Sequence, residues 1–261
     1  MPLPGIGYPY LAPGQKPPFA PARFYNKYAV PVPDFCMPVL PCEVGGSPRD
    51  WRGGKKIALA SGTKWSAGSL LFATSADMHS APPPLTCGTS HTWICRFNWD
   101  GGGNSQGCYL FDQQTSRFII APRDSQVGSF TKIAYYDGTW RLSGPAVTQG
   151  WQTVAWVLDG NAGLGHIYRD GVETTTPQTY TPVALSGASV QALFDRYSDN
   201  VSGRMSGLID YVQVFFSALS PAQVAAHCAD PYMWFREPRR VFYSLPSTAG
   251  ALLRRILTYS D

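Results

Sequence analysis

Two neighbouring stretches decide the fold of this chain: WQTVAWVLDG at residues 151–160 and HIYRDGV at residues 166–172. Both are rich in β-branched and aromatic side chains, which favours extended strands over helices. The second strand is expected to end at Asp170-Gly171, a dipeptide typical of tight hairpin turns, and Asp137-Gly138 marks another such turn. This part of the chain is therefore predicted to form short strands joined by turns.

The same alternation of strand and turn continues in both directions along the chain. Residues 92–99 have the alternating side-chain pattern of a strand, in which Trp93, Cys95, Phe97 and Trp99 share one face. Further strands are expected at residues 108–112, 117–121, 130–136, 139–142, 190–196 and 207–216. Short strands at this spacing predict an all-β fold, an antiparallel β-sandwich of the jelly-roll type.

One short helix is expected after the last strand. Ser220 is a natural N-cap residue, and Pro221 suits the first helical position because it needs no hydrogen-bonded N–H. The helical residues 222–228 follow, and Asp230-Pro231 ends the helix, since the residue before a proline avoids helical geometry.

The composition favours a binding protein with long loops. Charged residues make up 15% of the 261 residues and aromatic residues 13%, whereas an average soluble domain has about 25% charged residues. The net charge is +4, and lysines and arginines cluster only near the C-terminus, which argues against a nucleic-acid-binding surface. No stretch has the pattern of a signal peptide or of a membrane span, so we expect a protein made in the cytoplasm.

Six cysteines occur without a C-x-x-C pair, in a chain long enough to fold without disulfides. They are expected to be mostly buried thiols made in a reducing compartment. A bridge between Cys36 and Cys42 stays open as the alternative.

The two ends of the chain differ from the central region. Residues 1–42 interleave prolines with aromatic residues, which predicts an extended arm, and residues 229–261 form a second extended arm that is basic and aromatic. The jelly-roll domain is expected to span residues 43–228. Aromatic and arginine side chains are the usual anchors of interfaces. The expected partner-binding residues are Tyr8, Tyr10, Phe19, Phe24, Tyr25, Trp234, Phe235, Arg236, Arg239 and Arg240.

Three segments together resemble the LamG-like jelly roll, also called the concanavalin A-like lectin/glucanase fold. Residues 151–160 are similar to the family's W-x-x-V-A strand, and residues 166–172 to its L-Y-x-D-G strand and turn. Residues 207–224 are similar to the G-x-I-D-x-V-x-V strand that leads through A-L-S into a short helix. The resemblance covers roughly residues 50–228 and implies a lectin-type sandwich.

The segment that follows the helix, DPYMWFREPRR at residues 230–240, resembles tails found after such domains in tailed-bacteriophage structural proteins. This resemblance implies a location in the virion. The implied partners are the major capsid protein or neighbouring copies of the chain, in an oligomeric particle.

Because the same fold hosts glucanases, catalysis has to be considered. Glucanases of this fold carry their paired carboxylates in an E-x-D-x-x-E strand, whereas Glu43, Glu173 and Glu237 lie far apart here. GNSQG at residues 103–107 matches G-x-S-x-G, but strand patterns flank it on both sides, and a nucleophile elbow needs a helix after it. We therefore expect no enzyme.

Few residues suit a metal or a cofactor, and none is expected. The four histidines have no metal-ligand spacing. Some LamG-like domains bind calcium at the sandwich rim, and Asp195, Asp199 and Asn200 form the nearest candidate cluster here, but a polar turn is the favoured interpretation of these residues and calcium the alternative. The tryptophans on strand faces, Trp93, Trp99, Trp151 and Trp156, are expected in the core rather than in a sugar site.

The sequence thus predicts a non-enzymatic virion structural protein, a capsid decoration or cement protein docked by its terminal arms. The alternative is a tail-fibre or adhesin module that recognises host surface glycans with the rim of the sandwich. The lack of a heptad or repeat stem argues against that alternative. A fold alone does not establish either function.

Overall fold

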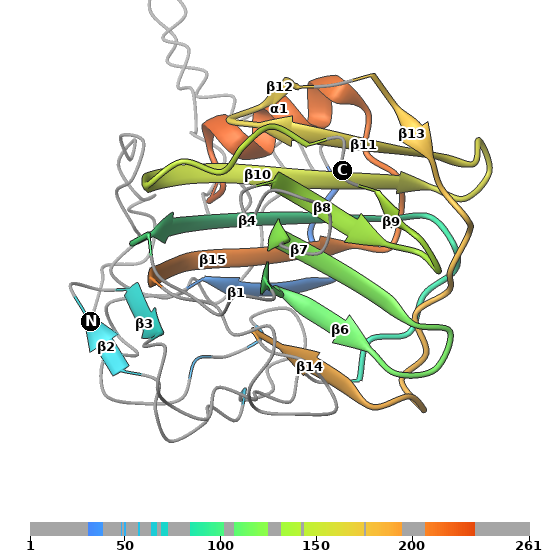
Figure 1. Ribbon diagram of the computed structural model, residues 1–261, viewed down its shortest axis with the longest axis horizontal. Helices are drawn as coiled ribbons and strands as arrows, with labels where there is room; N and C mark the ends of the chain where they lie inside the picture. Colours follow the sequence, from blue (N-terminus) through green and yellow to red (C-terminus); the bar gives the residue numbers. More distant parts are fainter. Residues whose placement is uncertain are drawn as a thin grey trace, which may run out of the picture.

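The computed structural model describes residues 31–38, 48, 50, 57, 64–66, 69–72, 84–101, 107–124, 132–141, 144–174, 176–194 and 207–232. These residues form two antiparallel sheets that pack face to face, with one short helix outside them (Figure 1). The predicted all-β jelly-roll sandwich is therefore confirmed.

The larger sheet has nine strands. In spatial order its main path is β12 (Val172–Glu173), β11 (Leu164–Arg169), β10 (Gly150–Asp159), β4 (His91–Trp99), β15 (Gly207–Phe215), β3 (Ser69–Phe72) and β2 (Lys64–Ser66). β13 (Gln178–Thr179) also pairs with β11, and β1 (Phe35–Pro38) also pairs with β15. The three longest strands, β4, β10 and β15, lie side by side at its centre.

The smaller sheet has six strands and covers one face of the larger one. In spatial order its main path is β14 (Gln191–Leu193), β6 (Phe111–Gln113), β7 (Phe118–Asp124), β8 (Lys132–Tyr136) and β9 (Trp140–Arg141), and β5 (Gly107–Cys108) also pairs with β7. The predicted hairpin at Asp137-Gly138 is present, because Tyr136 pairs with Trp140 across it.

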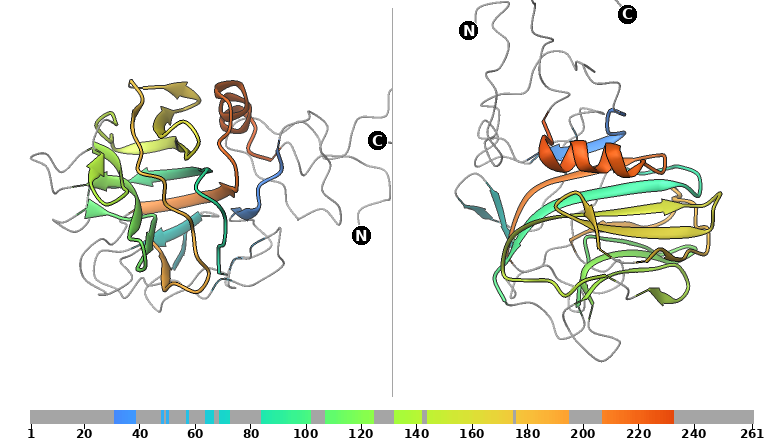
Figure 2. Two further views of the ribbon diagram at one scale, coloured as in Figure 1. Left: turned by 90° about the vertical axis from the view of Figure 1, so that its right-hand side faces the viewer. Right: turned by 90° about the horizontal axis from the view of Figure 1, so that it is seen from above.

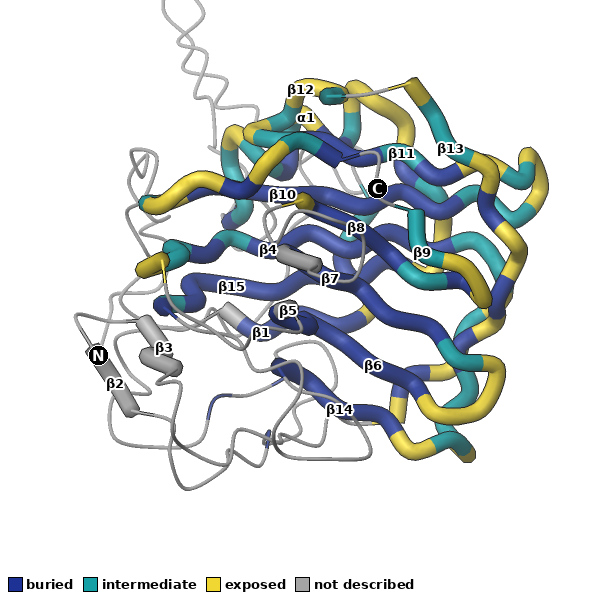
Figure 3. The backbone as a smooth tube through the Cα atoms, in the orientation of Figure 1, coloured by how far each residue is buried: buried dark blue, intermediate teal, exposed yellow. Residues whose placement is uncertain are grey.

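The main core lies between the two sheets. Trp93, Cys95 and Phe97 of β4 face it as predicted, and Trp99 packs against it while partly buried. Trp156 of β10 is fully buried there, and its indole N–H donates to the carbonyl of Ala134 at 3.0 Å. Figure 3 shows the central strands as almost continuously buried backbone. Burial of this kind contributes about 25 cal/mol per Å² of apolar surface.

A second apolar cluster covers the outer face of the nine-stranded sheet. Ile94, Tyr211 and Phe215 project from the sheet and pack against Leu219 and Val224. Helix α1 (Pro221–Ala229) supplies Val224 and lies on the same side of the sandwich as β1, opposite the six-stranded sheet (Figure 2). The large sheet is therefore buried on both faces along β4 and β15.

The predicted helix is confirmed with its cap. Ser220 accepts a hydrogen bond from the N–H of Gln223, and the Gln223 side chain accepts one from the N–H of Ser220, which together form a capping box. Asp230 closes the helix, as the sequence predicts.

Replacing Ser220 by alanine is expected to lower the free energy of unfolding by about 1 kcal/mol, because the first turn of α1 loses its cap. Urea unfolding of the full chain measures this effect. Ser217→Ala is the matched control, since Ser217 is an exposed serine just before the helix that caps nothing, and exposed substitutions usually change stability by less than about 0.5 kcal/mol. Equal losses in the two variants would contradict the role of the cap.

The strand bounds differ from the prediction in two places. The strand expected at residues 108–112 is split into β5 and β6 around Tyr109 and Leu110, where the N–H of Leu110 still donates to the carbonyl of Ile120. The strand expected at residues 190–196 ends at Leu193, since Phe194 has a φ of 67°, which extended backbone does not adopt.

Candidate binding site

A pocket of about 160 Å³ lies on the outer face of the nine-stranded sheet, where α1 ends. Such a volume is below the roughly 300–1,000 Å³ of sites for drug-sized ligands. It therefore suits one small ring or polar group. The lining residues are Arg96, Thr153, Asp170, Tyr211, Cys228, Ala229 and Pro231.

The floor of the pocket is a row of side chains across three central strands. Arg96 of β4 pairs directly with Thr153 of β10 on one side and with Tyr211 of β15 on the other. Residues opposite each other in an antiparallel sheet point to the same face. The register of the sheet therefore fixes the three side chains next to one another.

A β-bulge at Asp210 changes which side chains of β15 reach this face. The register against β4 shifts between Ile209 and Tyr211, so Asp210 is the extra residue. Ile209 and Val212 both belong to the core between the sheets, which leaves Asp210 and Tyr211 together for the outer face. The bulge thus brings a carboxylate and a phenol to the pocket region from consecutive positions.

Arg96 joins the pocket to an exposed tryptophan. Its Nη1 lies 2.9 Å from Oδ2 of Asp210, whose side chain is 3% exposed. The guanidinium carbon of Arg96 also lies 5.0 Å from the ring centroid of Trp151, within cation–π range. The ion pair and the indole therefore hold the guanidinium in one place beside the pocket.

The prediction that Trp151 belongs to the core is wrong, because its side chain is 43% exposed. Side chains alternate along a strand, so Trp151 and Thr153 share the outer face of β10, while Val154 and Trp156 face the core. Trp93 and Trp156 are confirmed in the core. Trp151 therefore presents its indole at the outer surface of the sheet and not to the core.

Asp170 reaches the pocket because it stands in a two-residue hairpin turn. Asp170 and Gly171 have φ values of 50° and 84°, and Arg169 pairs with Val172 across them, as a type I′ turn requires. Oδ1 of Asp170 accepts the N–H of Thr153 at 2.9 Å. This bond fixes the carboxylate against the end of β10.

The remaining titratable groups of the pocket are neutral. Burial raises the pKa of the Tyr211 phenol well above its usual value. Burial, with the nearby Asp170 carboxylate, raises the pKa of the Cys228 thiol to about 12. A thiol with such a pKa is a poor nucleophile, so Cys228 contributes surface to the pocket rather than reactivity.

The described ends of the two terminal segments meet beside this pocket. Nε2 of His227 in α1 lies 3.0 Å from the carbonyl oxygen of Pro31, and the amide of Gln213 in β15 donates to the carbonyl of Pro231 at 2.8 Å. Asp34 accepts the N–H of Phe216 at 2.7 Å. Both segments are thus fixed to one side of the sandwich, which is the side of α1 (Figure 2).

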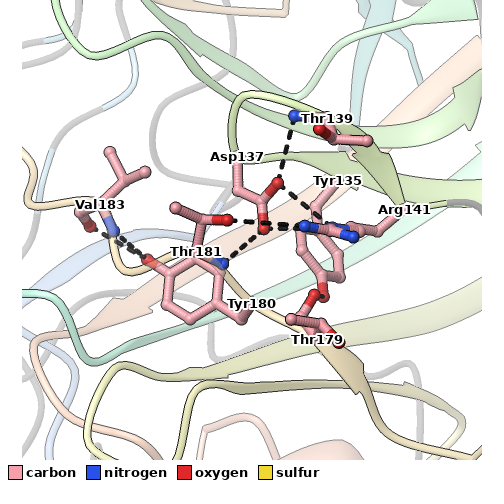
Figure 4. Close-up of polar contacts among 8 residues, drawn as sticks. All are labelled: Tyr135, Asp137, Thr139, Arg141, Thr179, Tyr180, Thr181 and Val183. Carbon is pink, nitrogen blue, oxygen red and sulfur yellow. Dashed lines mark hydrogen bonds and ion pairs between the residues drawn. The ribbon is translucent and has the colours of Figure 1, made fainter.

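A polar network at the tip of the β8–β9 hairpin has a structural role. Asp137 accepts hydrogen bonds from the N–H groups of Thr139 and Thr181 and pairs with Arg141, while Tyr180 bonds to Val183 (Figure 4). The network ties the hairpin to the segment between β13 and β14.

The structure leaves all of the predicted site residues untested. Tyr8, Tyr10, Phe19, Phe24 and Tyr25 in the first arm lie outside the described residues. So do the five of the second arm, which are Trp234, Phe235, Arg236, Arg239 and Arg240, and the calcium candidates Asp195, Asp199 and Asn200. Cys42 also lies outside them, so a bridge to Cys36 stays untested.

The described part of the chain forms neither a metal site nor a membrane-spanning helix. No group of three or more histidine, cysteine, aspartate or glutamate side chains there could hold a metal ion. No helix there is long and apolar enough to span a membrane. Glu173 of β12 lies on the surface and contacts His166, with 2.6 Å between Oε1 and Nδ1.

Sequence reasoning missed the pocket residues, although part of the signal was present. Counting by two from the buried Trp156 places Trp151 on the opposite face, so the exposure of Trp151 was predictable from strand alternation. The bulge at Asp210 and the approach of α1 to β10 involve residues distant in sequence. Neither feature can be predicted from a local sequence pattern.

The two packed antiparallel sheets with one short capping helix define a lectin-type β-sandwich. The family model described as the concanavalin A-like lectin/glucanases superfamily matches residues 72–225, more than half of the chain. The chain therefore belongs to this superfamily. No curated protein matches the chain in sequence.

Two solved structures show the same fold at low sequence identity. Domain 4 of AbnA, an extracellular arabinanase from Geobacillus stearothermophilus solved with arabinotriose, is 15% identical with a TM-score of 0.58, over 76% of this chain and 98% of that one. A sialidase from Trypanosoma rangeli, solved with 2,3-difluorosialic acid, is 12% identical with a TM-score of 0.53, over 78% of this chain and 34% of that one. These likenesses support the fold alone.

Proposed function

We propose that this chain is a non-enzymatic carbohydrate-binding module whose ligand site is the pocket beside Trp151. The exposure of the Trp151 indole next to a small polar pocket carries the proposal. Sugar sites combine an aromatic surface, against which the C–H groups of the ring pack, with a few fixed polar groups that bond the hydroxyls. Arg96, Thr153 and Asp170 provide such polar groups here.

The groups of the pocket support binding rather than hydrolysis. A glycosidase needs two carboxyl groups on either side of the scissile bond, one of them able to donate a proton. Asp170 is the one carboxylate among the residues that line the pocket. The neighbouring Asp210 is already engaged by Arg96, with 2.9 Å between Oδ2 and Nη1, and is not among the lining residues.

Replacing Trp151 by alanine is expected to weaken saccharide binding at least about fivefold, since a stacked ring contributes on the order of 1 kcal/mol or more. A glycan array followed by titration calorimetry with the best ligand measures this loss. Phe216→Ala is the matched control, because Phe216 is an aromatic residue 37% exposed that does not line the pocket. Unchanged binding by the Trp151 variant, with a folded chain, would refute the proposed site.

A second function is attachment to a virion, as a capsid decoration or cement protein held by its terminal arms. The observation that favours it is the joint fixation of Pro31 and Pro231 on the α1 side of the sandwich. Two arms that leave from one side can bind one partner surface together, and two linked contacts give more affinity than either alone. The two functions are compatible, because a docked domain can still present a sugar site.

The attachment proposal is tested with capsids assembled without this chain. A full-length variant in which Trp234, Phe235, Arg236, Arg239 and Arg240 are alanine is expected to lose co-sedimentation with the capsids, while Trp151→Ala retains it. If both variants and the unaltered chain fail to co-sediment, the attachment role is refuted, whatever the result with glycans.

A further inference from the structure

The charges around the pocket do not balance. Arg96 carries the positive charge, and its Nη1 is already paired with Asp210 at 2.9 Å. Asp170 carries a negative charge on an exposed turn and lines the pocket without a cationic partner among the described residues. Tyr211 and Cys228 are neutral because burial raises the pKa of both groups. The pocket therefore has an excess of one negative charge.

The two charged groups that line the pocket offer a ligand complementary hydrogen bonds, since the Asp170 carboxylate accepts and the Arg96 guanidinium donates. Oδ1 of Asp170 is used by the N–H of Thr153, and Oδ2 accepts no hydrogen bond from the described residues. Arg96 has five N–H groups, of which one is used by Asp210. A carboxylate oxygen and a guanidinium at the edge of one small pocket match two adjacent hydroxyls, one that donates and one that accepts.

We infer that the pocket binds a single neutral sugar unit through a pair of adjacent hydroxyl groups and discriminates against acidic sugars. This inference rests on the proposed carbohydrate-binding function. One hydroxyl of the pair donates to Oδ2 of Asp170, and the other accepts from Arg96. The sugar ring packs on the exposed part of Trp151, and the volume of about 160 Å³ limits the pocket to one unit.

Discrimination against acidic sugars follows from how Arg96 is held. An arginine that recognises a carboxylate frequently uses two parallel N–H groups, and a carboxylate already paired with that arginine weakens its attraction for a second anion. Here the β-bulge places Asp210 against Arg96, and Asp170 adds a second negative charge nearby. A sugar carboxylate would meet a repulsive field, and such repulsion sets specificity by rejecting the wrong ligand.

The test compares matched sugars that differ in their carboxylates. Galactotriose and trigalacturonate are titrated into the full chain at low ionic strength, where charge effects are strongest. We expect the neutral trisaccharide to bind at least about tenfold more tightly. Asp170→Asn is expected to weaken binding of the neutral sugar and to narrow this preference to less than about threefold, because the amide removes the charge but keeps the oxygen that accepts from Thr153.

A second variant is expected to move the preference in the same direction by another route. Asp210→Asn removes the charge that neutralises Arg96, so binding of trigalacturonate is expected to strengthen relative to galactotriose; thermal unfolding checks that the variant folds. Tighter binding of the acid by the unaltered chain, lost in Trp151→Ala, would overturn the inference and leave the proposed function standing. If neither these two sugars nor any glycan on an array binds, both are overturned.

Discussion

Replacing Asp137 by alanine is expected to lower the free energy of unfolding by about 3 kcal/mol. The Asp137 side chain is completely buried and pairs with Arg141, with 3.2 Å between Oδ1 and Nε. Removing one member of a buried ion pair leaves the other charge without compensation, which typically costs about 3–5 kcal/mol. The lower end of this range applies because the Arg141 side chain retains some exposure and can turn toward water.

The loss goes beyond one ion pair, because Asp137 also accepts two backbone N–H groups. Thr139 donates to Oδ1 within the hairpin turn at 3.2 Å, and Thr181 donates to Oδ2 from the facing segment at 2.7 Å. That segment also carries Tyr180, whose hydroxyl bonds to Val183, and Thr179, whose carbonyl accepts from Tyr135 (Figure 4). We therefore expect the segment between β13 and β14 to loosen when Asp137 is removed.

Urea unfolding at neutral pH measures the effect, and hydrogen exchange at residues 179–183 locates it. Asp159→Ala is the matched control, since Asp159 also accepts two backbone N–H groups in a turn but forms no ion pair with the described residues. The control is expected to lose about 1 kcal/mol, the usual effect of one turn or cap. Equal losses would show that the ion pair of Asp137 adds nothing.

Local signals in the sequence predicted most of the fold. Asp170-Gly171 forms the expected hairpin because a type I′ turn needs positive φ at both positions, which this dipeptide tolerates. Ser220 and Pro221 begin the helix because the capping interactions are confined to one turn. Trp93 and Phe97 face the core because the spacing of strand side chains is fixed at two residues.

The candidate site depends on contacts that no local pattern encodes. Arg96, Thr153 and Tyr211 come together through strand register, and the bulge that adds Asp210 is visible only once β15 is paired with β4. Asp137 was read as a turn residue, but its partner Thr181 lies far along the chain. The binding roles predicted for the two terminal arms remain proposals, because those residues lie outside the described structure.

Acid is expected to destabilise the folded chain well before its carboxylates are protonated, because two histidines are buried in neutral form. Burial lowers the pKa of both His91 and His227 to about 4, and in each case a backbone carbonyl opposes the shift only in part. In the unfolded chain a histidine titrates near 6.5. Between these values the unfolded state binds more protons, so stability is complete above about pH 6.5 and falls as the pH drops toward 4.

The hydrogen bonds show why neither ring accepts a second proton easily. Nδ1 of His91 accepts the indole N–H of Trp93 at 3.0 Å, so the proton of the neutral ring must be on Nε2, which faces the carbonyl of Val183. Protonation of Nδ1 would place an N–H of His91 opposite the indole N–H of Trp93, so that two hydrogen-bond donors would face each other. In His227, Nε2 faces the carbonyl of Pro31, while Nδ1 is buried without a hydrogen bond beside the ring of Phe215.

Urea unfolding at about pH 7, 5.5 and 4.5 tests this coupling, and each histidine is expected to contribute up to about 3 kcal/mol of the loss. His227→Gln removes one titration but keeps an amide N–H for Pro31, so its stability should fall less steeply with acid than that of the unaltered chain. His166→Gln is the control, because His166 lies on the surface and contacts Glu173. The unaltered chain and the two variants could also lose stability in parallel as the pH falls. In that case protonation of His227 does not weaken the contact between α1 and Pro31, and the acid sensitivity comes from other groups.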